Sequence, residues 1–358
     1  MNIAIFLPNW VGDLVMATPT LRAVRRHFGP SARIVGILRP QLAKLLHGSD
    51  WLDEQLPFDP KSGKKEFGRL ALVGHMRRQR FDVALLLTNS LHTAALAWLG
   101  GARQRVGYAR DGRSLLLTNP VQAARDGRQF RPVPMVESYL ALARAIGCQE
   151  ESLQLELNVT AAERTQAERV WHDLGLRTDG RVVVLNSSGA YGAAKLWPAE
   201  HCATLARQIV EQLNHDVLVL CGPGERDTAC QIVARAGSSR VFSLAAQAVS
   251  LGLTKGCLAR CRLMVSTDSG PRHIAAALGK PVVTLLGPTL PVWIENPSVR
   301  GPMLRAELDC LGCGKRTCPL GHHRCMQELT PERVLREVAA LVYTTTIEAA
   351  QEEMAWQR

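Results

Sequence analysis

The sequence predicts an α/β protein built from two doubly wound domains, each with a parallel sheet. Short segments rich in Ile, Val and Leu alternate with helix-forming segments, and this alternation occurs twice. Uninterrupted apolar strands between helices are typical of a parallel sheet covered on both faces. The chain has 358 residues, and a chain of this length usually folds into more than one domain, each with its own hydrophobic core. A polar, charged segment at residues 151–180 separates the two series, so we place the domain junction there.

The first series runs from residue 1 to about residue 165. We expect strands at residues 3–7, 33–38, 82–88 and 105–108, because each is a short apolar run. Helical patterns at residues 13–28 and 91–99 lie between them. These elements define a first Rossmann-like domain, which we assign to residues 1–165.

The second series occupies residues 175–330 and repeats the architecture without repeating the sequence. Its expected strands are residues 181–185, 216–221, 241–244, 262–266 and 281–286, and its helices include residues 201–213 and 271–278. We assign residues 331–358 to a C-terminal helix and tail, because Thr330 is a suitable cap before Pro331 at the first helical position. If two doubly wound domains face a central cleft, ligands bind at the carboxyl ends of their strands.

The net charge of +11 is concentrated in the first half of the chain. Residues 1–150 hold 21 Lys and Arg against 11 Asp and Glu, a net of +10, so the remaining residues carry only +1. A basic half indicates an anionic partner: nucleic acid, an anionic membrane surface or an acidic glycolipid. Aromatic residues make up only 5% of the chain, which disfavours a base-stacking platform, and we therefore expect no nucleic acid.

The composition also limits where the protein works. Apolar residues make up 46% of the chain, which excludes a disordered protein, and no apolar run is long enough for a spanning helix. The N-terminus enters a strand directly without a basic leader, so we expect no secretory signal. Ten cysteines in such a chain favour thiols over a disulfide scaffold.

The first candidate loop, residues 8–13 (PNWVGD), joins the first strand to its helix. Gly12 permits a close backbone approach, and Asp13 lies at the helix start. Asp13 is either a first-turn carboxylate that stabilises the helix or a general base that removes a proton from an attacking hydroxyl. The loop lacks the GxGxxG pattern, so a nicotinamide cofactor is poorly supported.

Two loops of the second domain combine small residues with one charged group. Residues 186–198 (NSSGAYGAAKLWP) leave room for a ligand beside Ser187, and Lys195 offers a point charge to a phosphate, or else is a solvated lysine. The spacing does not match a Walker A loop. Residues 221–225 (CGPGE) end in Glu225, which either accepts hydrogen bonds from ribose hydroxyls or closes a plain turn.

The third loop, residues 266–273 (STDSGPRH), carries the strongest signal of the three. It follows an apolar strand and opens a helix, so Ser269, Gly270 and the helix N-terminus form a pyrophosphate cradle. Asp268 could hold sugar hydroxyls, and His273 in the first turn could donate to phosphate oxygens. The alternative for His273 is a satisfied interior histidine.

Four cysteines, Cys310, Cys313, Cys318 and Cys325, lie within 16 residues. Their spacing could hold a tetrahedral structural zinc, although it is not the common paired CxxC arrangement. The alternative is a loop with reduced thiols or an incidental disulfide. Because the cluster follows the phosphate loops by some 40 residues, we expect no catalytic role for it.

Together these motifs resemble the bacterial heptosyltransferases of glycosyltransferase family 9. The resemblance rests on residues 9–13 (NWVGD), 192–198 (GAAKLWP), 268–273 (DSGPRH) and 287–289 (GPT), in order along nearly the whole chain. The cysteine-rich segment 310–326 (CLGCGKRTCPLGHHRCM) resembles the heptosyltransferase II branch of that family. One departure is Tyr191, where relatives often carry an acidic residue, so a role for this position is open.

The resemblance implies a GT-B fold and an inverting transfer of L-glycero-D-manno-heptose from ADP-heptose. The acceptor would be the inner-core heptose of Kdo-lipid A, in lipopolysaccharide core biosynthesis. It also implies that Asp13 is the general base and that the donor contacts Ser187, Lys195, Glu225, Asp268, Ser269, Gly270 and His273. Because such acceptors are anionic and lie at a membrane, we assign Lys61, Lys64 and Lys65 to acceptor binding.

The same resemblance implies a cytoplasmic enzyme on the inner face of the cytoplasmic membrane. No cofactor is required if protein cations neutralise the departing ADP. The alternatives are a heptosyltransferase acting at another core position and a family 9 relative that uses a different nucleotide sugar. A nucleotide-sugar epimerase of the same fold would not need a basic acceptor face, so the charge distribution disfavours it.

Overall fold

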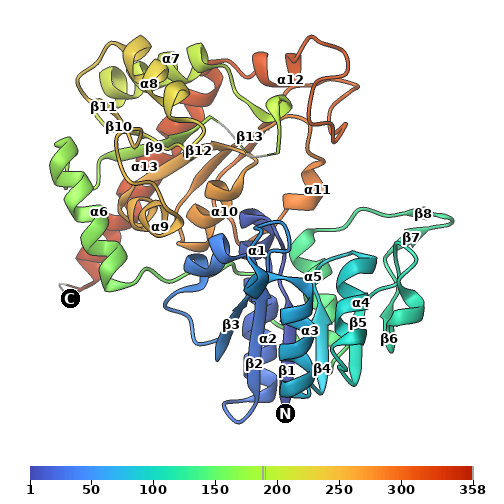
Figure 1. Cartoon of the computed structure of the whole chain (residues 1–358). Coiled ribbons are helices and arrows are strands. Elements are labelled where there is room, and N and C mark those ends of the chain that lie inside the picture. The colour runs from blue at the N-terminus through green and yellow to red at the C-terminus, as the bar shows by residue number, and fades with distance from the viewer. Residues whose placement is uncertain (188, 190, 357–358) are drawn as a thin grey trace. The chain divides into compact units, whose positions relative to one another are not determined.

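The computed structural model describes residues 1–187, 189 and 191–356, with side chains described through residue 344. The chain divides into two compact units. Unit 1 comprises Met1–Asn158 with Val292–Ser298, and unit 2 comprises Val159–Pro291 with Val299–Arg358. Each unit contains a six-stranded parallel sheet with helices packed against it, in accordance with the predicted doubly wound α/β architecture (Figure 1).

The sheet of unit 1 has the strand order β3-β2-β1-β4-β5-β6. Its strands are β1 (Asn2–Phe6), β2 (Arg33–Leu38), β3 (Glu54–Pro57), β4 (Val83–Leu86), β5 (Gln104–Tyr108) and β6 (Asn119–Val121). The chain first builds outward from β1 on one side and then returns to its other side with β4. The boundary between β1 and β4 is therefore the topological switch point, where doubly wound folds place their ligands.

The helices of unit 1 bury both faces of this sheet. They are α1 (Val11–Met16), α2 (Thr18–Phe28), α3 (Arg69–Gln79), α4 (Leu91–Leu99) and α5 (Met135–Arg144), with 3-10 turns η1 (Pro40–Leu46), η2 (Lys65–Phe67) and η3 (Ser114–Leu116). Ala4 and Phe6 of β1 share a core cluster with Leu72 and Met76 of α3, and Ala94 of α4 joins it. Helices α2 and α5 pack against each other.

The sheet of unit 2 has the order β11-β10-β9-β12-β13-β14, so its switch point lies between β9 and β12. Its strands are β9 (Val182–Asn186), β10 (Asp216–Val219), β11 (Val241–Ser243), β12 (Leu263–Thr267), β13 (Val282–Leu286) and β14 (Met303–Arg305). Every residue of β9, β12 and β13 is buried, which explains why these strands are recognisable as apolar runs.

The helices of unit 2 include the C-terminal one. They are α6 (Ala161–Leu174), η4 (Ala193–Lys195), α7 (Ala199–Leu213), α8 (Arg226–Ala236), α9 (Leu251–Arg260), α10 (Gly270–Ala277), α12 (Arg324–Gln327) and α13 (Pro331–Trp356). Helix α11 (Pro291–Ile294) crosses the unit boundary, because Val292–Ser298 belong to unit 1. Helix α6 packs on α9, and α13 packs on α7, so both belong to unit 2.

Some elements differ from the sequence-based expectation. The helix expected at residues 13–28 is two helices, because α1 ends at Met16 and α2 begins at Thr18, with Pro19 in its first turn. Strands β3, β6 and β14 were not expected. They are short outer strands of mixed polarity, and a half-exposed strand lacks the apolar run that identifies a central one. An antiparallel pair, β7 (Arg125–Asp126) and β8 (Gln129–Phe130), was also not expected.

None of the helices in the described part of the chain is long and apolar enough to cross a membrane.

Candidate active site

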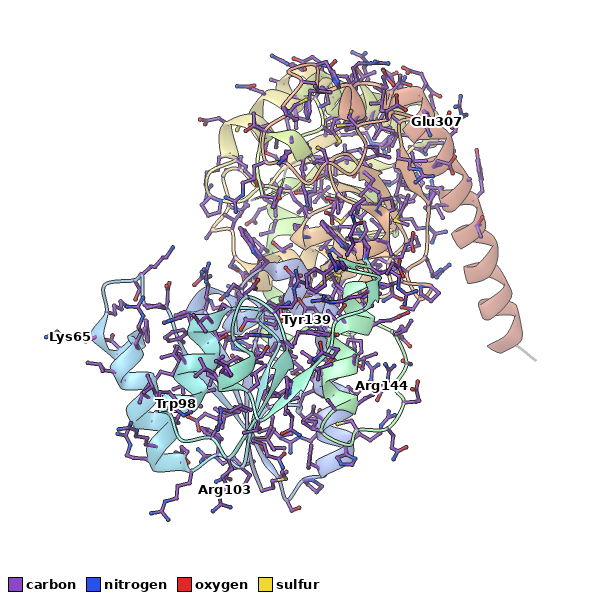
Figure 2. The ribbon with its side chains drawn as sticks, turned by 90° about the vertical axis from the view of Figure 1, so that its right-hand side faces the viewer. Lys65, Trp98, Arg103, Tyr139, Arg144 and Glu307 are labelled. Atoms are coloured by element: carbon purple, nitrogen blue, oxygen red, sulfur yellow. The ribbon has the colours of Figure 1, made fainter. Side chains whose placement is uncertain are left out.

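In unit 1, Asp13 lies in the first turn of α1, directly after the loop that follows β1. It is half-buried, and its Oδ1 accepts a hydrogen bond of 3.1 Å from the hydroxyl of Tyr139 on α5. Burial, together with the nearby Asp13 carboxylate, raises the pKa of Tyr139 well above its ordinary value. The tyrosine therefore stays protonated and orients one oxygen of the carboxylate. Figure 2 shows Tyr139.

In unit 2, three side chains converge on Asp268, just past the end of β12. Lys195 Nζ lies 2.5 Å from Asp268 Oδ2. Thr289, from the loop after β13, donates to the same oxygen at 2.7 Å. His273 Nε2 lies 3.6 Å from Oδ1. The structure thus brings together Lys195, Asp268 and His273, which lie in two separate sequence motifs.

The electrostatics of this cluster keep Asp268 ionised. Burial alone would raise the pKa of its carboxyl group, but the His273 hydrogen bond and the Lys195 charge lower that pKa further than burial raises it. Burial, and next the Arg272 charge, lower the pKa of His273, so its imidazole is neutral at pH 7. The Arg272 guanidinium lies 3.3 Å from Nδ1, which places the imidazole proton on Nε2, toward Asp268.

The start of α10 is open toward this cluster. Ser269 is the residue before the helix, but its side chain makes no capping bond. Instead Asn186 Nδ2 donates to Ser269 Oγ at 2.9 Å. The first N–H groups of α10, which begins at Gly270, are thus not capped by Ser269. Next to Lys195 and His273, they form an anion-binding arrangement suited to phosphate groups.

The other two donor candidates are engaged in local structure. The Glu225 carboxylate accepts a 2.6 Å hydrogen bond from the Gly222 N–H and closes the turn before α8. Ser187 is buried, its carbonyl oxygen accepts from the Trp197 N–H, and its side chain is hydrogen-bonded to the Cys202 thiol. Their roles in donor binding stay predictions.

The three lysines assigned to the acceptor lie in the exposed loop and turn before α3. Lys61 lines a pocket at the carboxyl edge of the unit 1 sheet. Lys64 lies over the Phe67 ring, with Nζ 5.4 Å from the ring centroid. Lys65 begins η2 and points outward at the margin of unit 1 (Figure 2). Of these three lysines, Lys61 is the one that lines this pocket.

The cysteine-rich segment contacts the loop that carries Lys195 directly, which its position in the sequence did not indicate. Tyr191 donates to the Gly314 carbonyl at 2.7 Å, and His323 Nε2 donates to the Ala194 carbonyl at 2.9 Å. Gly192 passes so close to this segment that a Cβ atom there would lie 2.5 Å from the Arg316 carbonyl oxygen. Two hydrogen bonds and a close backbone approach thus hold the loop that carries Lys195 against residues 310–323.

The four thiols of this segment do not form a ready ligand set. Burial raises the pKa of Cys325 to about 11, and the other three thiols of the cluster contribute to that shift. Within the described residues, however, no three His, Cys, Asp or Glu side chains are placed so that they could hold a metal ion. The arrangement as it stands does not fit a tetrahedral zinc, and the zinc stays a prediction.

Two doubly wound units, each with a six-stranded parallel sheet, have the architecture of a glycosyltransferase of the GT-B fold. The family model for glycosyltransferase family 9 (heptosyltransferase) matches residues 69–324, and the chain belongs to this family.

The similar proteins agree with this assignment. Lipopolysaccharide heptosyltransferase 2 of Escherichia coli K12 is 28% identical over 354 residues, which cover 96% of this chain and 99% of that protein. Lipooligosaccharide heptosyltransferase 2 of Campylobacter jejuni serotype O:2 is 26% identical, with coverage of 96% and 98%. The solved structure of E. coli ADP-heptose LPS heptosyltransferase II has a TM-score of 0.76 at 25% identity, covering 97% of this chain and 100% of that one.

Proposed function

We propose that this glycosyltransferase is a heptosyltransferase II: it transfers L-glycero-D-manno-heptose from ADP-heptose to the inner-core heptose of Kdo-lipid A. The observation that carries the proposal is the cluster of Lys195, Asp268 and His273 beside the open start of α10. This arrangement suits the diphosphate of a nucleotide sugar. The full-length similarity to proteins named heptosyltransferase 2 supports the choice of sugar and pathway.

In the proposed reaction, Asp13 takes the proton from the acceptor hydroxyl. The acceptor oxygen attacks C1 of the heptose, the bond between C1 and the phosphate oxygen breaks, and ADP leaves with the electron pair. Attack from the face opposite the leaving group inverts the configuration. The Tyr139 hydrogen bond supports this role, because the protonated phenol fixes one oxygen of the carboxylate.

Unit 2 supplies the charge that stabilises departing ADP. Lys195 and the N–H groups of α10 would face the diphosphate, and the neutral His273, whose Nε2 proton is directed at Asp268, would hold that carboxylate in place beside Lys195. Asp268 holds Lys195 at 2.5 Å and so positions its ammonium group before the donor arrives. These groups support a reaction that requires no cofactor. Glu225 and Ser187 complete the proposed donor site on the ribose side and in the loop after β9.

The acceptor and the place of action follow from the charge of the first half of the chain. A net charge of +10 over residues 1–150 suits a glycolipid that carries phosphates and carboxylates at an anionic membrane surface. We therefore place the enzyme in the cytoplasm, peripheral on the inner face of the cytoplasmic membrane, with no nucleic-acid partner. Lys61, Lys64 and Lys65 are proposed to contact this acceptor.

The test is product analysis with ADP-heptose and defined lipid acceptors that end at successive core positions. We expect one heptose to be added to an acceptor that already carries the first inner-core heptose, and none to an acceptor without it. Transfer to a different core position, or transfer only from another nucleotide sugar, would favour the alternatives within the family. Metal analysis of the purified full chain tests the zinc at Cys310, Cys313, Cys318 and Cys325.

A further inference from the structure

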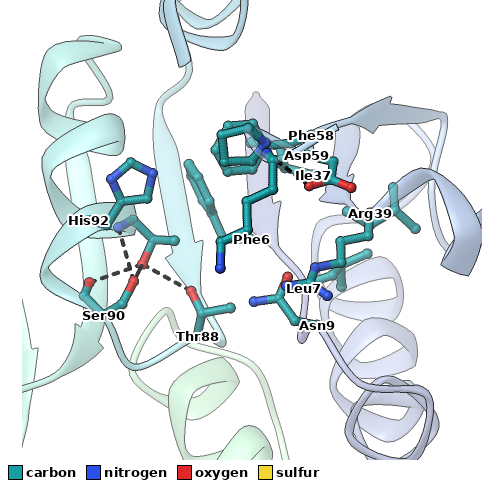
Figure 3. Close-up of a pocket in the computed structure, with 14 residues that line it drawn as sticks. Phe6, Leu7, Asn9, Ile37, Arg39, Phe58, Asp59, Thr88, Ser90 and His92 are labelled. Carbon is teal, nitrogen blue, oxygen red and sulfur yellow. Dashed lines mark hydrogen bonds between the residues drawn. The ribbon is translucent and has the colours of Figure 1, made fainter. Parts of the chain in front are cut away.

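Unit 1 contains a pocket of about 160 Å³ at the carboxyl edge of its sheet (Figure 3). Phe6 and Leu7 at the end of β1 line it, together with Arg39 just beyond β2 and Thr88 just beyond β4. The pocket therefore lies at the switch point of the unit 1 sheet, where this type of fold places ligands. Its size suits a single sugar ring rather than an extended oligosaccharide.

Part of the wall is aromatic. Phe6 closes the interior side, and the rings of Phe58 and His92 are stacked with centroids 6.2 Å apart and planes 21° apart. Figure 3 shows these rings from three separate segments along one side of the pocket. Apolar and aromatic walls with a few placed polar groups are typical of small-molecule sites, and they suit the C–H face of a sugar.

Two cationic side chains that line the same pocket, Arg39 and Lys61, have no hydrogen-bond or ion-pair partner among the described residues. The Asp59 carboxylate accepts the Lys61 N–H at 3.2 Å and so folds the turn that presents this lysine. Counting Arg39, Lys61 and Asp59, the lining carries a net charge of +1. A guanidinium beside an ammonium group favours a phosphate or a carboxylate.

Neutral polar groups complete the lining. Arg69 Nε donates to His92 Nε2 at 3.4 Å, which leaves the proton on Nδ1 as a donor. Burial, and next the Arg69 charge, lower the pKa of His92, so the ring is neutral at pH 7. Ser90 caps α4 by accepting from the Thr93 N–H at 3.1 Å. The Asn9 amide adds a donor and an acceptor that can bind sugar hydroxyls.

We propose that this pocket is a subsite for one anionic monosaccharide unit of the acceptor, a sugar that carries a phosphate ester or a carboxylate, with Arg39 and Lys61 binding the anionic group. The inference rests on the proposed function for its role in the acceptor, but the binding itself depends only on unit 1. Arg39, Phe58 and His92 thereby join the acceptor site, and Lys61 gains a defined contact.

The test measures sugar binding to the full chain by ligand-observed NMR titration. The probes are mannose 6-phosphate, glucuronate and uncharged mannose. We expect a charged sugar to bind at least about tenfold more tightly than mannose, and Arg39→Gln and Lys61→Gln each to weaken that binding about tenfold. The matched control is Arg103→Gln: the Arg103 side chain is 76% exposed and precedes β5 at the amino edge of the sheet.

The two charged probes separate the two sources of the anion. Preference for mannose 6-phosphate assigns the subsite to a phosphorylated sugar, and preference for glucuronate assigns it to a sugar acid. Equal affinity of mannose and both charged sugars would overturn the proposal, as would unchanged binding in both Arg39→Gln and Lys61→Gln. Lys61 lies in an exposed loop, so its variant tests the proposal even if Arg39→Gln does not fold.

Transfer assays distinguish failure of the subsite from failure of the proposed function. If Arg39→Gln raises KM for the lipid acceptor while ADP binding is unchanged, both stand. If charged sugars bind through Arg39 but no heptose is transferred to any acceptor, the subsite stands and the proposed function is wrong. If heptose is transferred and both variants leave KM and sugar binding unchanged, the function stands and the subsite is wrong.

Discussion

Asp13 depends on a residue that lies 126 positions further along the chain. The Tyr139 hydroxyl donates to its Oδ1 at 3.1 Å, a contact that the sequence did not indicate. The role of Asp13 as general base stays a prediction, and kinetics of two variants tests it.

We expect Asp13→Asn to lower kcat by about 100-fold or more, because an amide cannot remove the acceptor proton. Tyr139→Phe keeps the carboxylate and removes only its orienting bond, so we expect a smaller loss of kcat. Steady-state kinetics checks both, with ADP affinity by calorimetry as the control, which should stay near that of the unchanged enzyme. Near-normal turnover of Asp13→Asn would contradict its role as general base.

The donor cluster leads to a second prediction. Lys195→Ala and His273→Ala should each weaken ADP binding by about 1–3 kcal/mol, because the first removes a charge-assisted hydrogen bond to phosphate and the second removes the partner that orients Asp268 beside Lys195. Titration calorimetry with ADP measures this change. Arg207→Ala, which removes an exposed cation from α7 in the same unit, is the control and should bind ADP normally. Unchanged affinity in both cluster variants would mean that the diphosphate binds elsewhere.

At the scale of elements, the donor loop after β9 is held by a segment more than a hundred residues later. The Tyr191 hydroxyl donates a hydrogen bond to the Gly314 carbonyl of the cysteine-rich segment, and His323 of that segment donates one to the Ala194 carbonyl. The close approach at Gly192 leaves no room for a side chain. The cysteine-rich segment therefore supports the geometry of Lys195, whether or not it binds a metal.

We expect Tyr191→Phe and His323→Ala each to weaken ADP binding by about 0.5–1.5 kcal/mol, since each removes one hydrogen bond that positions the loop. In Tyr191→Phe the aromatic ring beneath Lys195 remains, so the loss is due to the hydroxyl alone. Calorimetry with ADP is the measurement, and Thr317→Ala at an exposed position in the same segment is the control. Normal ADP binding in both variants would show that the loop keeps its geometry without these bonds.

For the whole molecule, the distribution of charge matters more than its total. The +10 carried by residues 1–150 belongs to unit 1, whereas the rest of the chain is nearly neutral. Electrostatic attraction to an anionic surface acts over about a Debye length and weakens with salt. If the proposed function holds, such a field orients unit 1 toward an anionic membrane surface.

We expect the enzyme to sediment with phosphatidylglycerol-containing vesicles at low salt and to dissociate as salt rises. Replacing Lys61, Lys64 and Lys65 with Glu should reduce sedimentation while ADP binding stays intact. Reversing the exposed Arg164, Arg169 and Arg207 of unit 2 is the control for net charge. If both triple variants sediment equally, or if salt has no effect, the basic loop is not a docking surface.

A buried histidine makes the stability of unit 2 depend on pH. Burial, and next the charges of Arg181 and Arg262, lower the pKa of His215 below 6.5, although its bond to the Leu213 carbonyl opposes this shift. Below pH 6.5 the unfolded chain binds a proton that the folded chain does not, so stability falls as the pH falls. The slope is at most about 1.4 kcal/mol per pH unit for this residue.

Urea denaturation at pH 7 and pH 5.5 measures this effect. His215→Gln should lose less stability than the unchanged protein between these two pH values. The control is His172→Gln, whose side chain is 92% exposed and should not affect the pH dependence. An identical loss in His215→Gln would mean that other groups account for the acid sensitivity.

The sequence by itself determined the core strands, the order of the loops and the residue types that they carry. The strands β1, β9, β12 and β13 are buried almost throughout, so each is a run of mostly apolar residues that can be recognised from the sequence. The loops that follow them are recognisable because glycine, small residues and an isolated charge are adjacent in the chain. Lys195, Asp268 and His273 could be identified in this way.

Only the tertiary structure decided which of these residues meet. A parallel sheet gathers the carboxyl ends of strands that are far apart in the sequence, so contacts at that edge have no local pattern. Arg39, Phe58 and His92 line one pocket from three segments, and Tyr139 reaches Asp13 from α5. The same holds for Tyr191 and the cysteine-rich segment, because a hydrogen bond between distant loops depends on how the strands pair and the helices pack.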